Sequence, residues 1–243
     1  MFKRLFLLVT IIAIFSCNST QKYYTDVKEY GFKAKVKRIV TKHYESLAKY
    51  NHWLVNENNL VYVTTMNIDT VGNMTTIVDS SVTTLYKPFY RKYVYEHKDN
   101  LISGYKVYDL KGELIGASTV EWKSKYKYLA EAFFKIPSKY TINAYTELDN
   151  NFRQRKGGYV MKFENNKIMI RHYINKLINN GAIDYITKID TIIDYGAQTT
   201  KEFRVILEDV VYDAHHNLIQ FALVKSESGE LIEYISRTID YYE

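Results

Sequence analysis

Apolar and polar residues alternate along much of the chain, and this pattern predicts β-strands. Between residues 32 and 42, Phe32, Ala34, Val36 and Val40 alternate with lysines and a threonine. A period of two gives a strand one apolar face and one polar face. The stretches "FRVIL" at 203–207 and "LIQFALV" at 218–224 predict further strands. We therefore expect a mainly β chain.

Short turn motifs recur between these stretches. "YDLKGELI" from Tyr108 and "YDAHHNLI" from Tyr212 share an acceptor at the second position, a turn residue at the fifth and an apolar residue at the seventh. A hairpin loop built on a type I turn ends with one residue of positive φ, and Gly, Asn, Asp and His adopt that conformation most readily. The acceptor side chain can bond the amides of the turn. Six residues are expected to have positive φ: Gly72, Asp99, Gly112, Asn150, His216 and Gly229.

Other local signals are less uniform. "ENNK" at 164–167 and "NNGA" at 179–182 predict two more hairpins, with the two-residue turns that Asn-Asn and Asn-Gly favour. "YLAEAFF" at 128–134 is the best candidate for a short helix because of its Ala, Leu and Glu content. Apolar spacing at 168–179 fits a helix as well as a strand, and the neighbouring Asn-Gly turn favours the strand.

Two longer segments repeat a three-strand pattern. Asp99 and Gly112 lie thirteen residues apart, as do His216 and Gly229. Each pair frames one strand between two turns, which predicts meanders at about 91–122 and 203–241. The expected fold is an all-β, antiparallel meander of hairpins that forms a twisted or curved sheet or a partly open barrel. One or two short helices are expected beside it.

The first residues have the layout of an export signal. Lys3 and Arg4 precede an apolar run at 5–15, and the run ends at Ser16 and Cys17. Eleven residues are too few to cross a bilayer as a helix. "IFSC" at 14–17 resembles a bacterial lipobox, which implies cleavage before Cys17 and attachment of lipid to that residue. An ordinary signal peptide with an incidental cysteine is the alternative.

This reading divides the chain into a signal peptide at 1–16, a lipid-anchored tether at 17–30 and one β-rich domain at 31–243. Cys17 is the only cysteine, so no disulfide can form within the chain. The net charge of +6 falls to +4 when Lys3 and Arg4 are removed, and the basic residues are scattered. Nucleic acid is not an expected partner. The expected location is the bacterial cell envelope, with the membrane face left open.

The "YD..G.LI" units resemble the YD (Rhs-like) repeat lipoproteins of bacterial envelopes. The resemblance covers much of the mature chain but rests on these hairpin units alone. It implies an exported β-scaffold and no particular activity.

Catalytic and metal-binding signatures are absent from the sequence. It contains no Gly-rich phosphate loop, nucleophile elbow, HExxH motif or calcium loop. His215 and His216 could ligate a metal, but they lie in a predicted turn with no third ligand at suitable spacing, which favours a structural role. We expect no catalytic residue, metal or cofactor. Carboxylates distant in sequence could still meet in a cleft, as a hydrolase would require.

Aromatic residues are the other unusual feature, with 24 tyrosines and two tryptophans. Tyrosine suits half-buried sheet positions, and exposed rings can also stack on glycans or contact proteins. The first hypothesis is a membrane-anchored exported module that binds an envelope protein or a glycan. An inhibitor or immunity lipoprotein and an envelope hydrolase with an unrecognised site are the alternatives. The candidate binding aromatics are Trp53, Trp122, Tyr93 and Tyr95.

Overall fold

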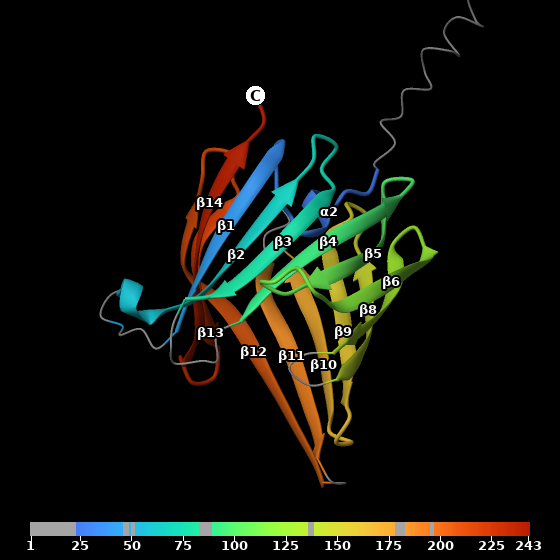
Figure 1. The fold of residues 1–243 in the computed structure, drawn as a ribbon. Helices are drawn as coiled ribbons and strands as arrows, with labels where there is room; N and C mark the ends of the chain where they lie inside the picture. Colours follow the sequence, from blue (N-terminus) through green and yellow to red (C-terminus); the bar gives the residue numbers. More distant parts are fainter. Residues whose placement is uncertain are drawn as a thin grey trace, which may run out of the picture.

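A computed structural model describes residues 23–45, 49, 52–82, 89–135, 139–177, 183–194 and 197–243. In it, antiparallel strands form a closed barrel in which each strand pairs with its neighbours in sequence and β14 pairs with β1 (Figure 1). The expected antiparallel meander is confirmed, and it closes completely. Cys17 and the turn expected at 179–182 lie outside the described residues.

The elements follow one another in a simple order. A short helix and a 3-10 turn, α2 (Asp26–Glu29) and η1 (Glu57–Asn59), accompany the strands. The strands are β1 (Val36–Tyr44), β2 (Leu60–Ile68), β3 (Met74–Ser81), β4 (Tyr90–Lys98), β5 (Leu101–Tyr108), β6 (Leu114–Ser124), β7 (Lys127–Phe134), β8 (Tyr140–Leu148), β9 (Gln154–Phe163), β10 (Ile168–Leu177), β11 (Ile183–Asp194), β12 (Ala197–Tyr212), β13 (Leu218–Lys225) and β14 (Leu231–Tyr241).

The helix expected at 128–134 is wrong, because these residues form β7. Ala132 and Phe134 are buried there, whereas Glu131 and Phe133 are exposed, so the segment has a period of two. Packing of one face outweighs the helix propensity of Ala and Glu. The preference for a strand in the ambiguous segment is borne out by β10 over 168–177.

The Asp-containing hairpins share one local geometry. The carboxylates of Asp69, Asp109, Asp149 and Asp213 each accept hydrogen bonds from the backbone amides two and four residues further on. The residue three positions after each Asp has positive φ, namely Gly72, Gly112, Phe152 and His216. Gly229 also has positive φ, at 67°.

Asn150 was expected in the left-handed region, and this expectation is wrong, since Phe152 has that conformation with φ of 64°. With Asn150 at the fifth position of the motif, the acceptor at the second position would be Glu147, but the structure uses Asp149, so the motif moves by two residues. A phenylalanine is strained at positive φ. Its ring is 2% exposed in an apolar cluster with Tyr24 and Leu148, and this packing offsets the strain.

Two other turns differ in length from the common hairpin. Asp99 and Asn100 both have positive φ, at 53° and 60°, which is typical of a two-residue type I′ turn. The hairpin at 164–167 forms as expected, but its loop spans three residues and ends at Asn166 with φ of 63°.

Residues 23–35 enter the barrel at the end where β1 begins and β14 ends, and we call them the plug segment. Helix α2 lies within the ring of strands (Figure 1). Val27 packs with Val36, Ile39 and Ile68, and Tyr24 is 5% exposed. Residues 23–30, which fall within the expected tether, therefore belong to the barrel.

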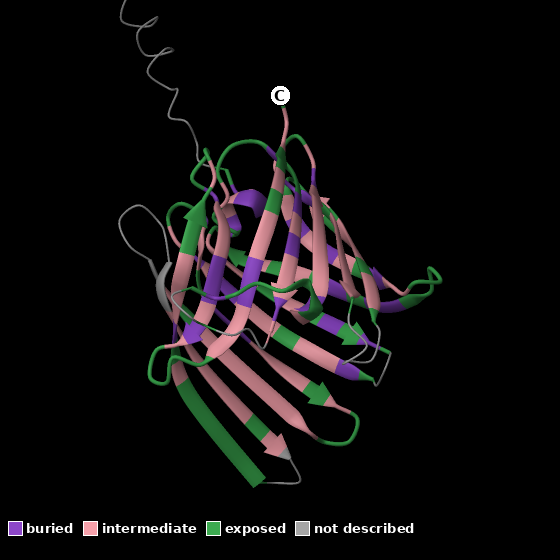
Figure 2. Cartoon of the chain, turned by 90° about the vertical axis from the view of Figure 1, so that its left-hand side faces the viewer, coloured by how far each residue is buried: buried purple, intermediate pink, exposed green. Residues whose placement is uncertain are grey.

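The outer face carries exposed charged residues on several strands, namely Lys92, Lys106, Glu121 and Glu131 on β4 to β7. Buried, intermediate and exposed residues all occur along the strands of the barrel (Figure 2). A lysine on the lipid side of a membrane barrel costs about 2–4 kcal/mol at the bilayer centre. This part of the outer face is therefore suited to water. None of the described helices is long and apolar enough to cross a membrane.

Candidate binding site on the inner wall

Charged and aromatic side chains form two rows across β9 to β12. Register places Tyr159, Arg171, Asp190 and Lys201 in one row, and Gly157, Tyr173, Lys188 and Phe203 in the next. The second row continues through Thr146 to Tyr128, whose hydroxyl bonds to Glu29 of the plug segment. Paired residues point to the same side of a sheet. Both rows therefore face the interior, and we call them the inner-wall site.

Arg171 and Asp190 make a two-pronged ion pair. Nε of Arg171 donates to Oδ1 of Asp190 at 2.6 Å, and Nη2 donates to Oδ2 at 2.7 Å. The guanidinium also lies 6.0 Å from the ring centre of Tyr159. The Arg171 side chain is 38% exposed although it faces inward, so solvent reaches the interior beside β10 and β11. The pair is thus fixed in geometry and open to a ligand.

Lys188 lies next to this pair with aromatic cross-strand neighbours, Tyr173 and Phe203. Within the described residues its ammonium has no hydrogen-bond or ion-pair partner. Burial, together with the positive charge of Arg171, lowers the pKa of Lys188, and Glu233 and Asp190 offset this only in part. A negatively charged ligand would supply the missing counter-charge.

The ring of Tyr173 is held in place by its neighbours. Nε2 of Gln154 donates to the Tyr173 hydroxyl at 2.5 Å. A Cβ at Gly157 would overlap that hydroxyl, so glycine is needed for the ring to lie against β9. The site therefore contains an aromatic ring of fixed position beside the unpaired ammonium.

A second inward-facing group joins β1, β2 and β14. Nδ1 of His43 lies 2.6 Å from Oε1 of Glu233, which also accepts a hydrogen bond from the Tyr62 hydroxyl at 3.1 Å. The rings of His43 and Tyr62 stack at 3.9 Å. Register carries the face of Lys188 across β12 and β13 to Glu233, so this group and the inner-wall site face a common interior.

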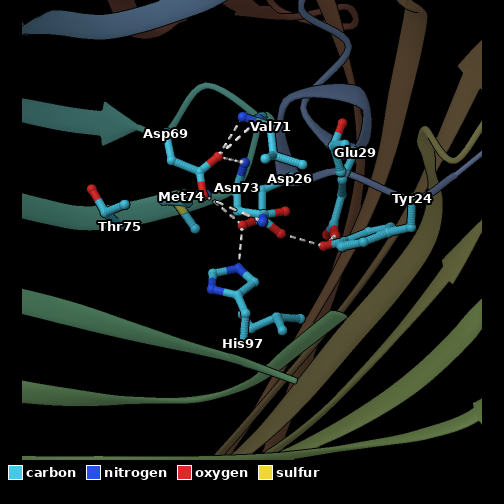
Figure 3. A network of polar contacts seen from close by, with 12 residues as sticks. Tyr24, Asp26, Glu29, Asp69, Val71, Asn73, Met74, Thr75 and His97 are labelled. Carbon is cyan, nitrogen blue, oxygen red and sulfur yellow. Dashed lines mark hydrogen bonds and ion pairs between the residues drawn. The ribbon is translucent and has the colours of Figure 1, made fainter. Parts of the chain in front are cut away.

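The plug segment contains two acidic residues, Asp26 and Glu29, of the kind that a hydrolase uses (Figure 3). Asp26 accepts hydrogen bonds from the Tyr24 hydroxyl at 2.6 Å and the Met74 amide at 2.7 Å, and it contacts Nε2 of His97 at 2.8 Å. Glu29 contacts the hydroxyls of Tyr24 and Tyr128, each at 2.7 Å.

Both carboxyl groups are enclosed, with Asp26 only 2% and Glu29 only 7% exposed. Burial raises the pKa of Glu29 to about 7. A raised pKa is typical of a general acid, but these oxygens are already engaged by the protein. The cluster therefore holds the plug segment in place and does not favour the hydrolase alternative.

Three of the four predicted binding aromatics come together in the interior. Tyr93 and Tyr95 lie 5.7 and 5.5 Å from Tyr105, measured between ring centres. Trp122 lies 4.8 Å from Tyr24 and donates its indole N–H to the carbonyl of Ile102 at 2.9 Å. Tyr95 and Trp122 pack in the cluster that contains Tyr24 of the plug segment, whereas Tyr93 packs with residues of the neighbouring strands. All three rings are therefore part of the interior packing.

Trp53 is separate from the other three. It is buried in a cluster with Tyr44, Ala222 and Tyr234, on the side of the sheet opposite to the inner-wall site. Its indole N–H donates to Glu208 at 3.3 Å. Trp53 therefore fastens the β1–β2 connection to the outer face of the barrel.

The adjacent histidines lie in the β12–β13 turn. His216 has φ of 60°, and the ring of His215 lies 4.3 Å from the ring of Tyr241. Across the part of the chain that the structure describes, no group of three His, Cys, Asp or Glu residues could hold a metal ion. The geometry of His216 is that of the turn position it was predicted to occupy.

Comparison with known proteins gives distant structural similarities. A porin-like protein from Bacteroides vulgatus has a TM-score of 0.44 and 10% identity, over 86% of this chain and 99% of that one. A porin-like protein from Bacteroides uniformis has a TM-score of 0.36 and 9% identity, over 90% of this chain and 99% of that one. No family model and no curated protein matches. What this chain does must therefore follow from its own side chains.

Proposed function

We propose that this chain is an exported, lipid-anchored barrel that binds a saccharide on its inner wall. The observation that carries the proposal is the solvent-reached Arg171–Asp190 pair, which lies on the inner face beside tyrosine rings. Sugar hydroxyls both donate and accept hydrogen bonds, and the fixed pair offers both functions. Tyrosine faces pack on the apolar faces of sugar rings.

The closed barrel favours a glycan over a protein partner. Pairing of β14 with β1 leaves no free edge among the described strands, so a partner cannot add a strand to the sheet. A folded protein could touch only the rim or the outer face. A saccharide needs no free strand edge, and solvent reaches the inner wall at Arg171, beside its charged and aromatic side chains. The export signal and Cys17 would hold the barrel at the envelope, where glycans occur.

Binding can be tested with inner and outer tyrosine variants. Envelope saccharides would be screened against the mature chain by isothermal titration calorimetry. Tyr159→Ala and Tyr173→Ala should weaken binding about tenfold each, because each removes a ring contact of about 1 kcal/mol or more. Tyr108 pairs with the outward-facing Lys92, so its side chain lies on the outer face. Tyr108→Ala is therefore the control and should bind as wild type does.

The proposal is wrong if no saccharide binds to the folded wild-type chain. It is also wrong if the two inner variants keep full affinity while circular dichroism shows an intact barrel. Equal losses in all three variants would place the binding surface elsewhere.

A further inference from the structure

The positive charges of the inner-wall site are unequally compensated. Asp190 neutralises Arg171 through two short hydrogen bonds, and this occupies the fork with which arginine would grip a ligand anion. Lys201 is exposed and hydrated. Lys188, by contrast, is partly buried and makes no hydrogen bond or ion pair within the described residues, and the charges of Glu233 and Asp190 offset its own only in part. It is the cation at this site with the most to gain from a ligand anion.

The surroundings of Lys188 limit what that anion can be. Register places an aromatic residue opposite Lys188 on each neighbouring strand, Tyr173 on β10 and Phe203 on β12. A ligand group that pairs with Lys188 must therefore be attached to a body that tolerates contact with rings. One partly buried ammonium matches one negative charge. A singly charged carboxylate fits this better than a doubly charged phosphate.

We propose that the ligand is an acidic saccharide, whose carboxylate pairs with the ammonium of Lys188 while its sugar ring packs beside Tyr173. This inference rests on the proposed function, because it names the class of saccharide bound at the same site. The Arg171–Asp190 pair then bonds hydroxyl groups of the sugar and does not carry its charge. The paired carboxylate returns the pKa of Lys188 towards its ordinary value, because it removes the unopposed positive charge.

Paired acidic and neutral probes test the inference. Trisaccharides of glucuronate and galacturonate would be titrated against the mature chain, with the neutral glucose and galactose trisaccharides beside them. Wild type should bind at least one acidic probe about tenfold or more tightly than its neutral counterpart. Raising the salt concentration should reduce that preference, since charge carries it.

Two lysine variants test which residue causes the preference for the acidic probe. Lys188→Gln should abolish the preference, measured as the ratio of the affinities for the acidic probe and its neutral counterpart. Lys162→Gln changes an exposed lysine on β9, which β10 separates from β11, and should retain the full preference. Circular dichroism on both variants shows that the barrel is intact.

The outcomes separate the two proposals. Equal binding of acidic and neutral probes by wild type overturns the acidic class and leaves saccharide binding standing. A preference that persists in Lys188→Gln overturns the role of Lys188. Absence of binding by every probe counts against both the ligand class and the proposed function, and the wider saccharide screen then decides whether the function survives.

Discussion

The hydroxyl of Tyr24 lies 2.7 Å from Oε2 of Glu29 and, at the same time, 2.6 Å from Oδ1 of Asp26. One hydroxyl has one proton and can donate to only one of these carboxyl groups. The second short contact is a hydrogen bond only if a carboxyl group supplies its own proton. Burial raises the pKa of Glu29 to about 7, so Glu29 is the residue that holds this proton.

The first prediction is that the barrel loses stability as pH rises. Glu29 has a pKa near 4.5 when unfolded and about 7 when folded, so the folded state binds the proton more tightly. Its contribution is complete below about pH 4.5 and is lost as pH rises to about 7, by roughly 3 kcal/mol. Urea unfolding at about pH 5 and about pH 8 measures the difference.

Glu29→Gln provides the matched control, because an amide can donate to Tyr24 and accept from Tyr128 without a titrating proton. The variant should be more stable than wild type at about pH 8 and should show a smaller loss between the two pH values. A wild-type chain whose stability rises over this range, with no change in Glu29→Gln, would contradict the proton-sharing arrangement.

The second prediction compares two residues of the same backbone conformation. Phe152→Gly relieves strain at φ of 64° but removes a ring that lies 5.3 Å from that of Tyr126 and 6.1 Å from that of Tyr24. We expect a net destabilisation of about 2–3 kcal/mol, since loss of a buried phenylalanine outweighs the strain. His216→Gly has a similar φ at an exposed position and should be neutral or slightly stabilising. Urea unfolding measures both, and equal effects would refute the role given to packing.

The sequence predicts the strands well because their signals are local. Alternation and turn residues lie within a few positions of each other, so each hairpin can be recognised separately. Closure of the barrel depends on pairing of Val36 with Tyr241 across the whole chain, and no local pattern encodes it. Glu147 and Asp149 show that the sequence also leaves a detail of one turn undetermined. They lie two residues apart and share a strand parity, so alternation cannot tell which of them is the acceptor of the turn.

The inner-wall site could be predicted only in part. Lys188 and Asp190 alternate with Ile189 in the sequence, which indicates a strand with charge on one face. That this face points inward, and that Asp190 meets Arg171, depends on the register of β10 with β11. The tyrosines were recognised as candidates for sugar contact, but composition could not show which of their rings face the interior.

The third prediction isolates the backbone requirement of a turn. Gly112 has φ of 80°, and a Cβ placed there meets no atom within 4 Å. Gly112→Val should therefore cost about 1–2 kcal/mol through backbone strain alone, because a β-branched side chain disfavours this region. Gly112→Asn is the control and should cost less, since asparagine tolerates positive φ. Thermal unfolding compares the three chains, and a valine variant as stable as wild type would refute the strain.

The last prediction concerns the anchor. The apolar run before Cys17 and the lipobox-like "IFSC" predict that Cys17 carries lipid. Each buried methylene of an acyl chain contributes about 0.8 kcal/mol to membrane binding, so several chains hold a protein stably. Wild type expressed with its own first residues in a bacterium should partition into the detergent phase, and Cys17→Ala should remain in the aqueous phase. Cys17→Ala also tests whether the charged outer face needs the lipid for attachment. Equal partitioning of the two chains would show either that the cysteine is incidental or that the barrel itself binds the membrane. Mass spectrometry of the wild-type N-terminus distinguishes these two explanations by the presence or absence of acyl groups.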